Sequence, residues 1–422
     1  MIKRIAALTA AVLTGLLCSC GEQSVVESQT EQVTITLSWW GNDARNEYTL
    51  KAVKRFEEAH PEIKVKCSYS EWSGYEARSR VQMFSGTEAD VMQINVGWLS
   101  EYSPDGSGYY DLDKLSDTVD LSNFSDDMLE YGRRGEPEST LNAVPIAMNA
   151  QTVYINKTIY DKYGLDVPTH WEDFFEAAKV MSKDGVYPLA AADKPMWLYC
   201  VAYGEQVSGK KFFDKEGLMT FTADDFKVMI DFYNRLVKEK VSPKLEDYQN
   251  FNIDNGVYAG VVGWVSDAQN FMSKAINAGN EIVPAPYTAF EGMQNGEGWY
   301  EKPATLYAVS KNTEHPKEAG ILLDFMLNSH EWAELQGVEK GIPVSSSARQ
   351  YLDEIGKLSG LQYEASLVME ENEYISPMDS TIENSDLYQH FFEACNLVLF
   401  DKETSDKAAK DLYALYIEDY PV

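Results

Sequence analysis

Apolar and polar residues follow two regular periods near the start of the chain. Alternation over residues 33–37 predicts a strand, and alternation over residues 63–69 predicts a second strand. Between them, segment 46–60 has apolar residues at helical spacing and ends before Pro61. These apolar residues are Leu50, Val53 and Phe56. A strand, a helix and a strand form a βαβ unit, which predicts a mostly parallel sheet covered by helices.

The same two periods continue through the rest of the sequence. A short apolar run over Asp90–Asn95 predicts another strand. Thr169 stands three residues before Glu172, which predicts a capping box at the start of a helix. Thr222 is predicted to cap a later amphipathic helix, and Pro316 to open another. The chain is therefore predicted to be α/β over its whole length.

The first residues are typical of a targeting segment. Two basic residues precede the apolar run Ile5–Leu17, which is too short to span a bilayer comfortably, so we expect a signal peptide over residues 1–19. The run ends in "LLCSC", which resembles the bacterial lipobox, and Cys20 fits as the lipidated cysteine because Ser19 is a small residue before the cut. An ordinary signal peptide with two incidental cysteines is the alternative. Residues 20–31 are polar and predict a flexible tether.

Composition narrows the classes of ligand. The chain has 422 residues, 44% of them hydrophobic, and this length favours two or more domains. It carries 36 basic and 67 acidic residues, a net charge of −31, which repels phosphate backbones and anionic lipid headgroups. Nucleic acid is therefore excluded and a neutral ligand is favoured. Beyond the leader, Cys67, Cys200 and Cys395 are few and widely spaced, so we predict buried thiols rather than disulfides or a metal site.

Five sequence blocks carry a resemblance that covers nearly the whole mature chain. In order they are "WWGNDARNEYTLKAVKRFEEAHPEIKV", "FSGTEADVMQIN", "AVPIAMNAQTVYINKTIYDKYGLDVPTHWEDF", "NGVYAGVVGW" and "AVSKNTEHPKEAGILLDFML". This order resembles the family 1 extracellular solute-binding proteins, the sugar-capturing components of bacterial ATP-binding-cassette importers. One departure is Ile155, which replaces the second tyrosine of the "YYNK" that many relatives have. The sugar contacts that relatives make at this segment therefore carry over to this chain less directly.

The resemblance implies a periplasmic-binding-protein-like α/β fold of two lobes, each with a mostly parallel sheet flanked by helices, joined by a multi-strand hinge. It also implies a monomer outside the cytoplasm, held to the cell membrane only by its N-terminal lipid. Its partners would be a carbohydrate and the permease subunits of the importer, with no cofactor. The predicted boundaries are 32–148 and 303–342 for lobe 1, and 149–302 and 343–422 for lobe 2.

The segment "ITLSWWGNDAR" raises the question of how a sugar would be held. In open α/β sheets ligands gather beyond the carboxyl ends of strands, and sugar sites combine aromatic planes with polar side chains. Neighbouring strand residues point to opposite faces, so we expect Trp40 at the ligand and Trp39 inside. Asp43 and Arg45 could instead form a solvated turn pair. The predicted ligand-binding residues are Trp40, Asp43, Arg45, Trp72, Gln93, Asn95, Trp98, Asn149, Trp264 and Asp267.

Two other classes of function remain as alternatives. A glycoside hydrolase needs only paired carboxylates, but 67 acidic residues make such a pair uninformative. The segment "HEWAE" at His330 lacks the second histidine of HExxH, and the sequence has neither a GxSxG elbow nor a phosphate-binding loop. A surface sensor or adhesin with the same fold is the second alternative. The sequence therefore predicts a binding protein without catalytic or metal-binding residues.

Overall fold

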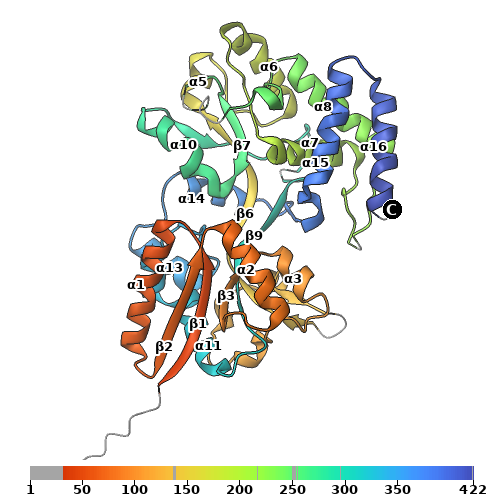
Figure 1. Ribbon diagram of the computed structural model, residues 1–422. Coiled ribbons are helices and arrows are strands. Elements are labelled where there is room, and N and C mark those ends of the chain that lie inside the picture. The colour runs from red at the N-terminus through yellow and green to blue at the C-terminus, as the bar shows by residue number, and fades with distance from the viewer. Residues whose placement is uncertain are drawn as a thin grey trace, which may run out of the picture.

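The computed structural model describes residues 32–422, apart from residues 136–138, 216, 250–252, 254, 295 and 421. The predicted signal peptide, Cys20 and the tether lie outside the described residues. Within the described part of the chain, no helix combines the length and the apolar character needed to cross a membrane. The chain forms two lobes, and Figure 1 shows lobe 1, which contains the first strands, below lobe 2.

Lobe 1 begins with three parallel strands and the helices that follow them. The strands are β1 (Val33–Trp40), β2 (Ile63–Ser70) and β3 (Val91–Ile94), in the order β2-β1-β3. The helices are α1 (Asp43–Ala59), α2 (Trp72–Ser85) and α3 (Gly97–Tyr102). The predicted βαβ unit is confirmed. Val53 and Phe56 are buried as predicted, but Leu50 is 39% exposed because Tyr48 and Ala52 complete the buried side of α1.

Further elements from two parts of the chain complete lobe 1. Before the hinge lie η1 (Leu112–Leu115), η2 (Leu121–Asn123), α4 (Asp126–Glu130), β4 (Arg133–Arg134) and β5 (Thr140–Leu141). After the hinge lie α11 (Pro316–Asn328), α12 (His330–Gln336) and α13 (Ser346–Glu354). Pro316 opens α11, as predicted. One core lies on the α1, α11 and α12 face of the sheet, and a smaller one lies on the α2 and α3 face.

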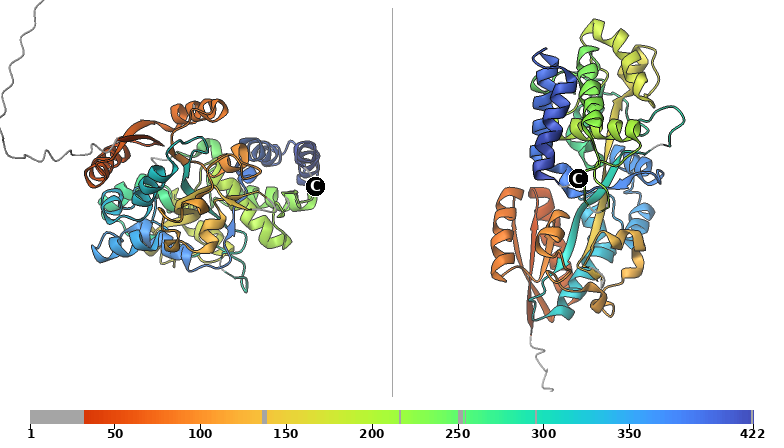
Figure 2. Two further views of the ribbon diagram at one scale, coloured as in Figure 1. Left: turned by 90° about the horizontal axis from the view of Figure 1, so that it is seen from below. Right: turned by 90° about the vertical axis from the view of Figure 1, so that its right-hand side faces the viewer.

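Two long strands connect the lobes. β6 (Ala143–Asn156) and β9 (Tyr300–Val309) run antiparallel to each other, and Figures 1 and 2 show both passing between the lobes. The complete sheet has the order β2-β1-β3-β9-β6-β7, with β10 (Ser376–Pro377) beside β9 and β8 (Ile282–Pro284) beside β6. Parallel pairing joins β1 to β2 and β3, whereas β6 is antiparallel to β7, β8 and β9. The hinge therefore belongs to one sheet that both lobes share.

Lobe 2 is built on β7 (Gly260–Trp264) and a large helical core. α7 (Asp193–Ser208) is buried along most of its length, and α7, α15 and α16 pack around α8 (Ala223–Lys238). The other helices are α5 (Lys157–Lys162), α6 (Trp171–Met181), η3 (Ser182–Asp184), η4 (Leu245–Asp247), η5 (Val265–Asp267), α10 (Ala268–Asn277), α14 (Leu361–Glu370), η6 (Ser380–Glu383), α15 (Ser385–Leu399) and α16 (Ser405–Asp419).

One detail differs from the sequence-based expectations. The box at the start of α6 is shifted by one residue, because the Asp173 carboxylate, not Glu172, accepts the backbone N–H of His170 at 2.8 Å. The cap at Thr222 is confirmed. In the C-terminal part, α13 packs against α12 whereas α14 packs against β8, so we propose a third passage between these two helices instead of near Ile342.

Candidate ligand-binding site

Strand direction brings the ends of strands from both lobes toward one another. β9 runs from lobe 2 into lobe 1 and is antiparallel to β3, so the carboxyl ends of β1, β2 and β3 point toward lobe 2. β7 is antiparallel to β6, so its carboxyl end at Trp264 points back toward lobe 1. This is the arrangement in which ligands of open sheets are held beyond strand ends.

An aromatic cluster lies at the carboxyl ends of the lobe 1 strands. Trp40 ends β1, Trp72 opens α2 after β2, and Trp98 lies in α3 after β3. The ring centroid of Trp40 is 4.9 Å from that of Trp72, and the Trp72 and Trp98 rings are stacked at 5.8 Å. Tyr75 completes the cluster, 5.4 Å from Trp40 and 6.0 Å from Trp98. We call these four residues the lobe 1 aromatic group.

Trp39 and Trp40 point to opposite faces, as the alternation predicts. Trp39 is 1% exposed, stacks on Tyr69 with ring centroids 4.7 Å apart, and donates its indole N–H to Asn46 at 2.9 Å. Trp40 is half-buried and packs on the opposite side of the sheet, with Trp98. Alternation within one strand therefore separates a core indole from an accessible one.

The nine tryptophans fall into two classes according to the partner of the indole N–H. Five donate it to a protein acceptor: Trp39, Trp171, Trp197, Trp299 and Trp332. Among the described residues, the other four have no acceptor for this group: Trp40, Trp72, Trp98 and Trp264. A buried indole N–H normally finds a partner, so these four are the indoles able to donate to a ligand or to water.

A second cluster lies on one face of the hinge. Asn149 and Gln151 alternate on β6, Lys302 is opposite Asn149, and Trp264 is opposite Gln151, so the four side chains share that face. The Lys302 ammonium lies 4.7 Å from the ring centroid of Trp264. It also pairs with the Glu383 carboxylate. We call these five residues the hinge cluster.

One carboxylate of the hinge cluster, that of Glu383, pairs with two lysines. Glu383 pairs with Lys302 and also with Lys194, whose ammonium is 3.3 Å away. Burial alone would raise the pKa of Glu383, but the two lysines together hold it below its usual value. One carboxylate thus faces two ammonium groups. The hinge cluster itself is therefore neutral, and together with Lys194 it carries one positive charge in excess.

Three of the predicted residues use their side chains to hold turns of the protein in place. Asn149 and Ser266 exchange two hydrogen bonds of 3.1 and 3.2 Å. The Asp267 carboxylate accepts the backbone N–H of Trp264 at 3.0 Å, and burial raises its pKa. The Asn95 side chain accepts the N–H of Gly97 at 2.9 Å and so shapes the turn into α3. Asn149 and Asp267 fix the turn that carries Trp264, and Asn95 fixes the turn that carries Trp98.

Gln93, Arg45 and Asp43 do not join either cluster. Gln93 is 1% exposed and accepts from the buried Lys340 ammonium at 3.0 Å, on the α1 face of the sheet. The Arg45 guanidinium donates to the backbone carbonyl of Glu339 at 2.8 Å. Asp43 is exposed in the first turn of α1, where its charge favours the helix N-terminus. Within β3, alternation turns Gln93 away from the face of Met92 and Ile94, which pack with the aromatic group.

Sequence reasoning also missed four residues of these clusters. Tyr75 lies one helical turn after Trp72, which is a signal that could have been used. Gln151, Lys302 and Glu383 had no local signal, because only the fold brings residues from β6, β9 and η6 together. In the described part of the chain, no group of three or more His, Cys, Asp or Glu side chains could hold a metal ion.

Known proteins share both the sequence pattern and the fold. The profile of the bacterial extracellular solute-binding proteins matches residues 41–330. A multiple sugar-binding protein of Streptococcus mutans is 27% identical over 198 residues, covering 46% of this chain and 45% of that protein. The chain therefore aligns with less than half of this curated relative. The structure of a periplasmic oligogalacturonide-binding protein from Yersinia enterocolitica, in complex with saturated digalacturonic acid, has a TM-score of 0.79 and 26% identity, covering 92% of this chain and 98% of that one.

One similar structure is a de novo designed cysteine esterase, with a TM-score of 0.84 and 26% identity over 92% of this chain and 98% of that one. Its activity was introduced by design. A cysteine nucleophile reacts as the thiolate, and here burial raises the pKa of Cys67 to about 11 and that of Cys200 and Cys395 further. The described thiols therefore stay protonated at neutral pH. With more than half of its length matched by the family profile, this chain belongs to the bacterial extracellular solute-binding proteins.

Proposed function

We propose that this protein captures a carbohydrate between the lobe 1 aromatic group and the hinge cluster and delivers it to the permease of an ATP-binding-cassette importer. The observation that carries the proposal is the division of the tryptophans. The four indoles with no acceptor among the described residues lie at strand ends that face each other from both lobes. Membership of an extracellular family implies an extracytoplasmic location.

The chemistry of the two clusters suits a sugar. The C–H face of a pyranose packs against an aromatic plane, while its hydroxyl groups need donors and acceptors at the ring edge. Trp72 is 38% exposed and Trp40 and Trp264 are half-buried, so their rings can still lose water-exposed area to a ligand. Free indole N–H groups and the Lys302 ammonium supply donors beside these rings.

We favour a neutral oligosaccharide. The protein carries a net charge of −31, and the Lys302 ammonium is already paired with Glu383. A specific observation supports an acidic sugar as a second candidate, because Lys194 and Lys302 share one carboxylate. The Yersinia enterocolitica protein, whose structure holds digalacturonic acid, has the same fold.

Thermal unfolding against sugar panels tests the proposal. Neutral gluco- and manno-oligosaccharides form one panel and oligogalacturonates form the other. A ligand at about 100 times its dissociation constant stabilises the folded protein by about 2.7 kcal/mol, which appears as a rise in Tm. A rise with one panel identifies the class of sugar. An unchanged Tm across both panels at millimolar concentration contradicts sugar capture.

We further propose that Cys20 carries the lipid that holds the protein at the membrane. Cys20→Ala should block lipid attachment, and the matched control Cys18→Ala should leave it intact. Mass spectrometry of the mature N-terminus decides between them, and a mature chain that starts anywhere except at lipidated Cys20 contradicts the proposal. Uptake of the identified sugar by cells lacking this protein separates an importer subunit from a sensor or adhesin, because only the importer role requires loss of uptake.

A further inference from the structure

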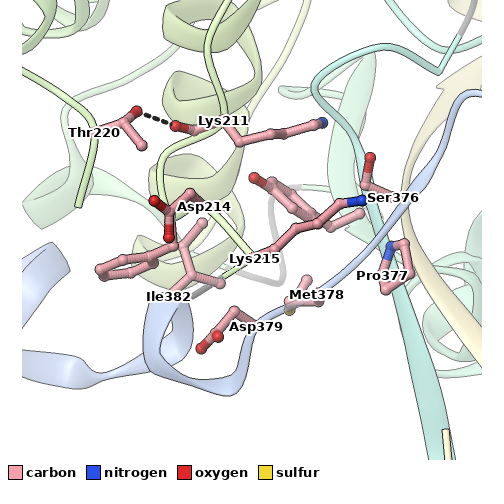
Figure 3. A pocket seen from close by; sticks show the side chains of 11 residues that line it. Lys211, Asp214, Lys215, Thr220, Ser376, Pro377, Met378, Asp379 and Ile382 are labelled. Carbon is pink, nitrogen blue, oxygen red and sulfur yellow. Dashed lines mark hydrogen bonds between the residues drawn. The ribbon is translucent and has the colours of Figure 1, made fainter. Parts of the chain in front are cut away.

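A second cavity lies in lobe 2 beside the hinge. Its volume is about 680 Å³, within the range of about 300–1,000 Å³ typical of small-molecule sites. Figure 3 shows side chains from two separate segments surrounding it, one over residues 211–220 and one over residues 376–382. Phe213, Tyr300 and Ile382 are the buried apolar part of the lining, whereas Pro377 is exposed and Met378 half-buried.

This cavity adjoins the hinge cluster. Tyr300 lies two residues before Lys302 on β9, so alternation puts both side chains on the same face, about 6.6 Å apart along the strand. Ile382 directly precedes Glu383, the partner of Lys302. The cavity wall at Ser376 and Pro377 pairs with β9 through β10. The cavity therefore lies next to the hinge cluster on the same face of β9.

The cavity repeats the chemistry of the hinge cluster. In the hinge cluster an ammonium lies over an aromatic ring and pairs with a carboxylate. Beside the cavity, the Lys211 ammonium lies 5.1 Å from the ring centroid of Tyr300 and 3.0 Å from the carboxylate of Glu205. The Tyr300 hydroxyl donates to the same carboxylate. Two neighbouring places on one strand thus offer the same combination of groups, as a ligand made of repeating units requires.

Lys215 supplies a donor that none of the described residues uses. Its side chain is among those that line the cavity in Figure 3, and it is exposed. Its ammonium has no hydrogen-bond or ion-pair partner among the residues that the structure describes. Pro377 and Met378 provide an accessible apolar surface opposite this cation. An apolar face with a donor at its edge fits a sugar ring.

We propose that this cavity is an extension subsite that receives a further sugar unit of an oligosaccharide whose preceding unit packs on Trp264. The inference rests on the proposed sugar capture and adds the direction in which the ligand extends. It follows that the protein prefers chains over monosaccharides, because only a chain reaches from the hinge cluster to Met378 and Lys215.

Isothermal titration calorimetry on the mature protein tests this, with gluco-oligosaccharides and oligogalacturonates from one to about six units as probes. In the series that binds, affinity should rise at least tenfold when the chain becomes long enough to enter the cavity. Met378→Trp should fill the cavity and remove that rise while leaving the shortest binding ligand unaffected. Lys215→Ala should weaken only the long ligands, about threefold to tenfold, and does not disturb packing because Lys215 is exposed.

Lys402→Ala is the matched control, since Lys402 is also an exposed lysine but is not part of the cavity lining. It should bind every chain length as the wild type does. Equal affinities for all chain lengths, or an unchanged rise in both cavity variants, overturn the extension subsite while sugar capture stands. No binding in either series overturns sugar capture itself and the subsite with it.

Discussion

Two aromatic clusters of this protein have similar ring geometry but different surroundings. In the lobe 1 aromatic group, ring centroids lie 4.9–6.3 Å apart. In lobe 2, Trp171, Tyr199, Phe232 and Trp299 form a cluster whose centroids lie 4.9–6.5 Å apart. Stacked and edge-on pairs occur in both. Ring packing alone therefore cannot tell a binding surface from a core.

The partner of the indole N–H and the exposure of the ring do separate Trp40 and Trp72 from the tryptophans of the lobe 2 cluster. Trp171 donates its N–H to Gln206 at 2.7 Å and Trp299 to the Thr288 carbonyl at 3.0 Å, and both rings are at most 2% exposed. Trp40 and Trp72 are accessible, and no acceptor among the described residues takes their N–H groups. The indoles of the lobe 2 cluster find their acceptors within the protein, whereas the N–H groups of Trp40 and Trp72 are left for a ligand or for water.

Truncating a core ring should have the largest effect. Trp299→Ala should lower the free energy of unfolding by about 3–5 kcal/mol, because it removes a fully buried ring and leaves a cavity in lobe 2. Trp72→Ala, at a ring that is 38% exposed, should lower it by less than about 1 kcal/mol. Urea unfolding measures both. Equal losses in the two variants would break the distinction between the clusters.

The adjacent residues Trp39 and Trp40 test the difference between a core indole and a binding-site indole most directly. Trp40→Ala, and Trp264→Ala from the opposite lobe, should each weaken sugar binding by about 2 kcal/mol, or about thirtyfold, while the fold persists. Trp39→Ala should destabilise the fold, since it removes a buried ring and leaves Asn46 without its donor. Calorimetry and urea unfolding on the same three variants separate the two effects. Normal binding by folded Trp40→Ala and Trp264→Ala would show that neither ring contributes to the sugar site.

The parts of the fold and of the candidate site that could be predicted are those that depend on local sequence signals. Periodicity was sufficient for β1, α1 and β2, and for the opposite faces of Trp39 and Trp40, because these depend only on residues within one element. Alternation could not place Gln93 in advance, because the pattern within β3 does not say which face of the sheet carries the aromatic group. Glu383 and Lys302 are 81 residues apart, so their pairing depends wholly on tertiary structure.

The two lysine–carboxylate pairs of lobe 2 should differ in their response to pH. Lys302 and Lys194 hold the pKa of Glu383 below its usual value of 4.5, so this carboxylate stabilises the fold above that value and loses the contribution as pH falls through its folded-state pKa. Burial raises the pKa of Glu205 despite Lys211, so protonation of this group favours the fold as pH falls.

Variants at the two carboxylates test this contrast. Glu383→Gln should reduce the loss of stability below about pH 4.5, and Glu205→Gln should instead make stability fall more steeply as pH decreases, since its favourable protonation is removed. Urea unfolding from about pH 7 to about pH 3 measures both slopes. The same change of slope in both variants would contradict the assigned pKa directions.

The smallest expected effect is a change in shape. The lobe 1 aromatic group and Trp264 belong to different lobes, whereas the lobe 2 core lies within one, so only the former can come together on closure. The two long hinge strands and the proposed third passage restrict the lobes to hinge motion. To raise the closed population from 1% to 99%, the sugar must bind the closed form about ten-thousandfold more tightly than the open form. Such a difference requires contacts from both lobes. Small-angle scattering with a saturating sugar should show the radius of gyration decrease by a small fraction of about 22 Å, the value for a compact chain of 422 residues. Trp264→Ala at the same sugar concentration should contract less, because it loses one of the opposing contacts. A wild-type profile that stays unchanged while calorimetry shows full occupancy would mean that the two indole-bearing faces do not close on the sugar.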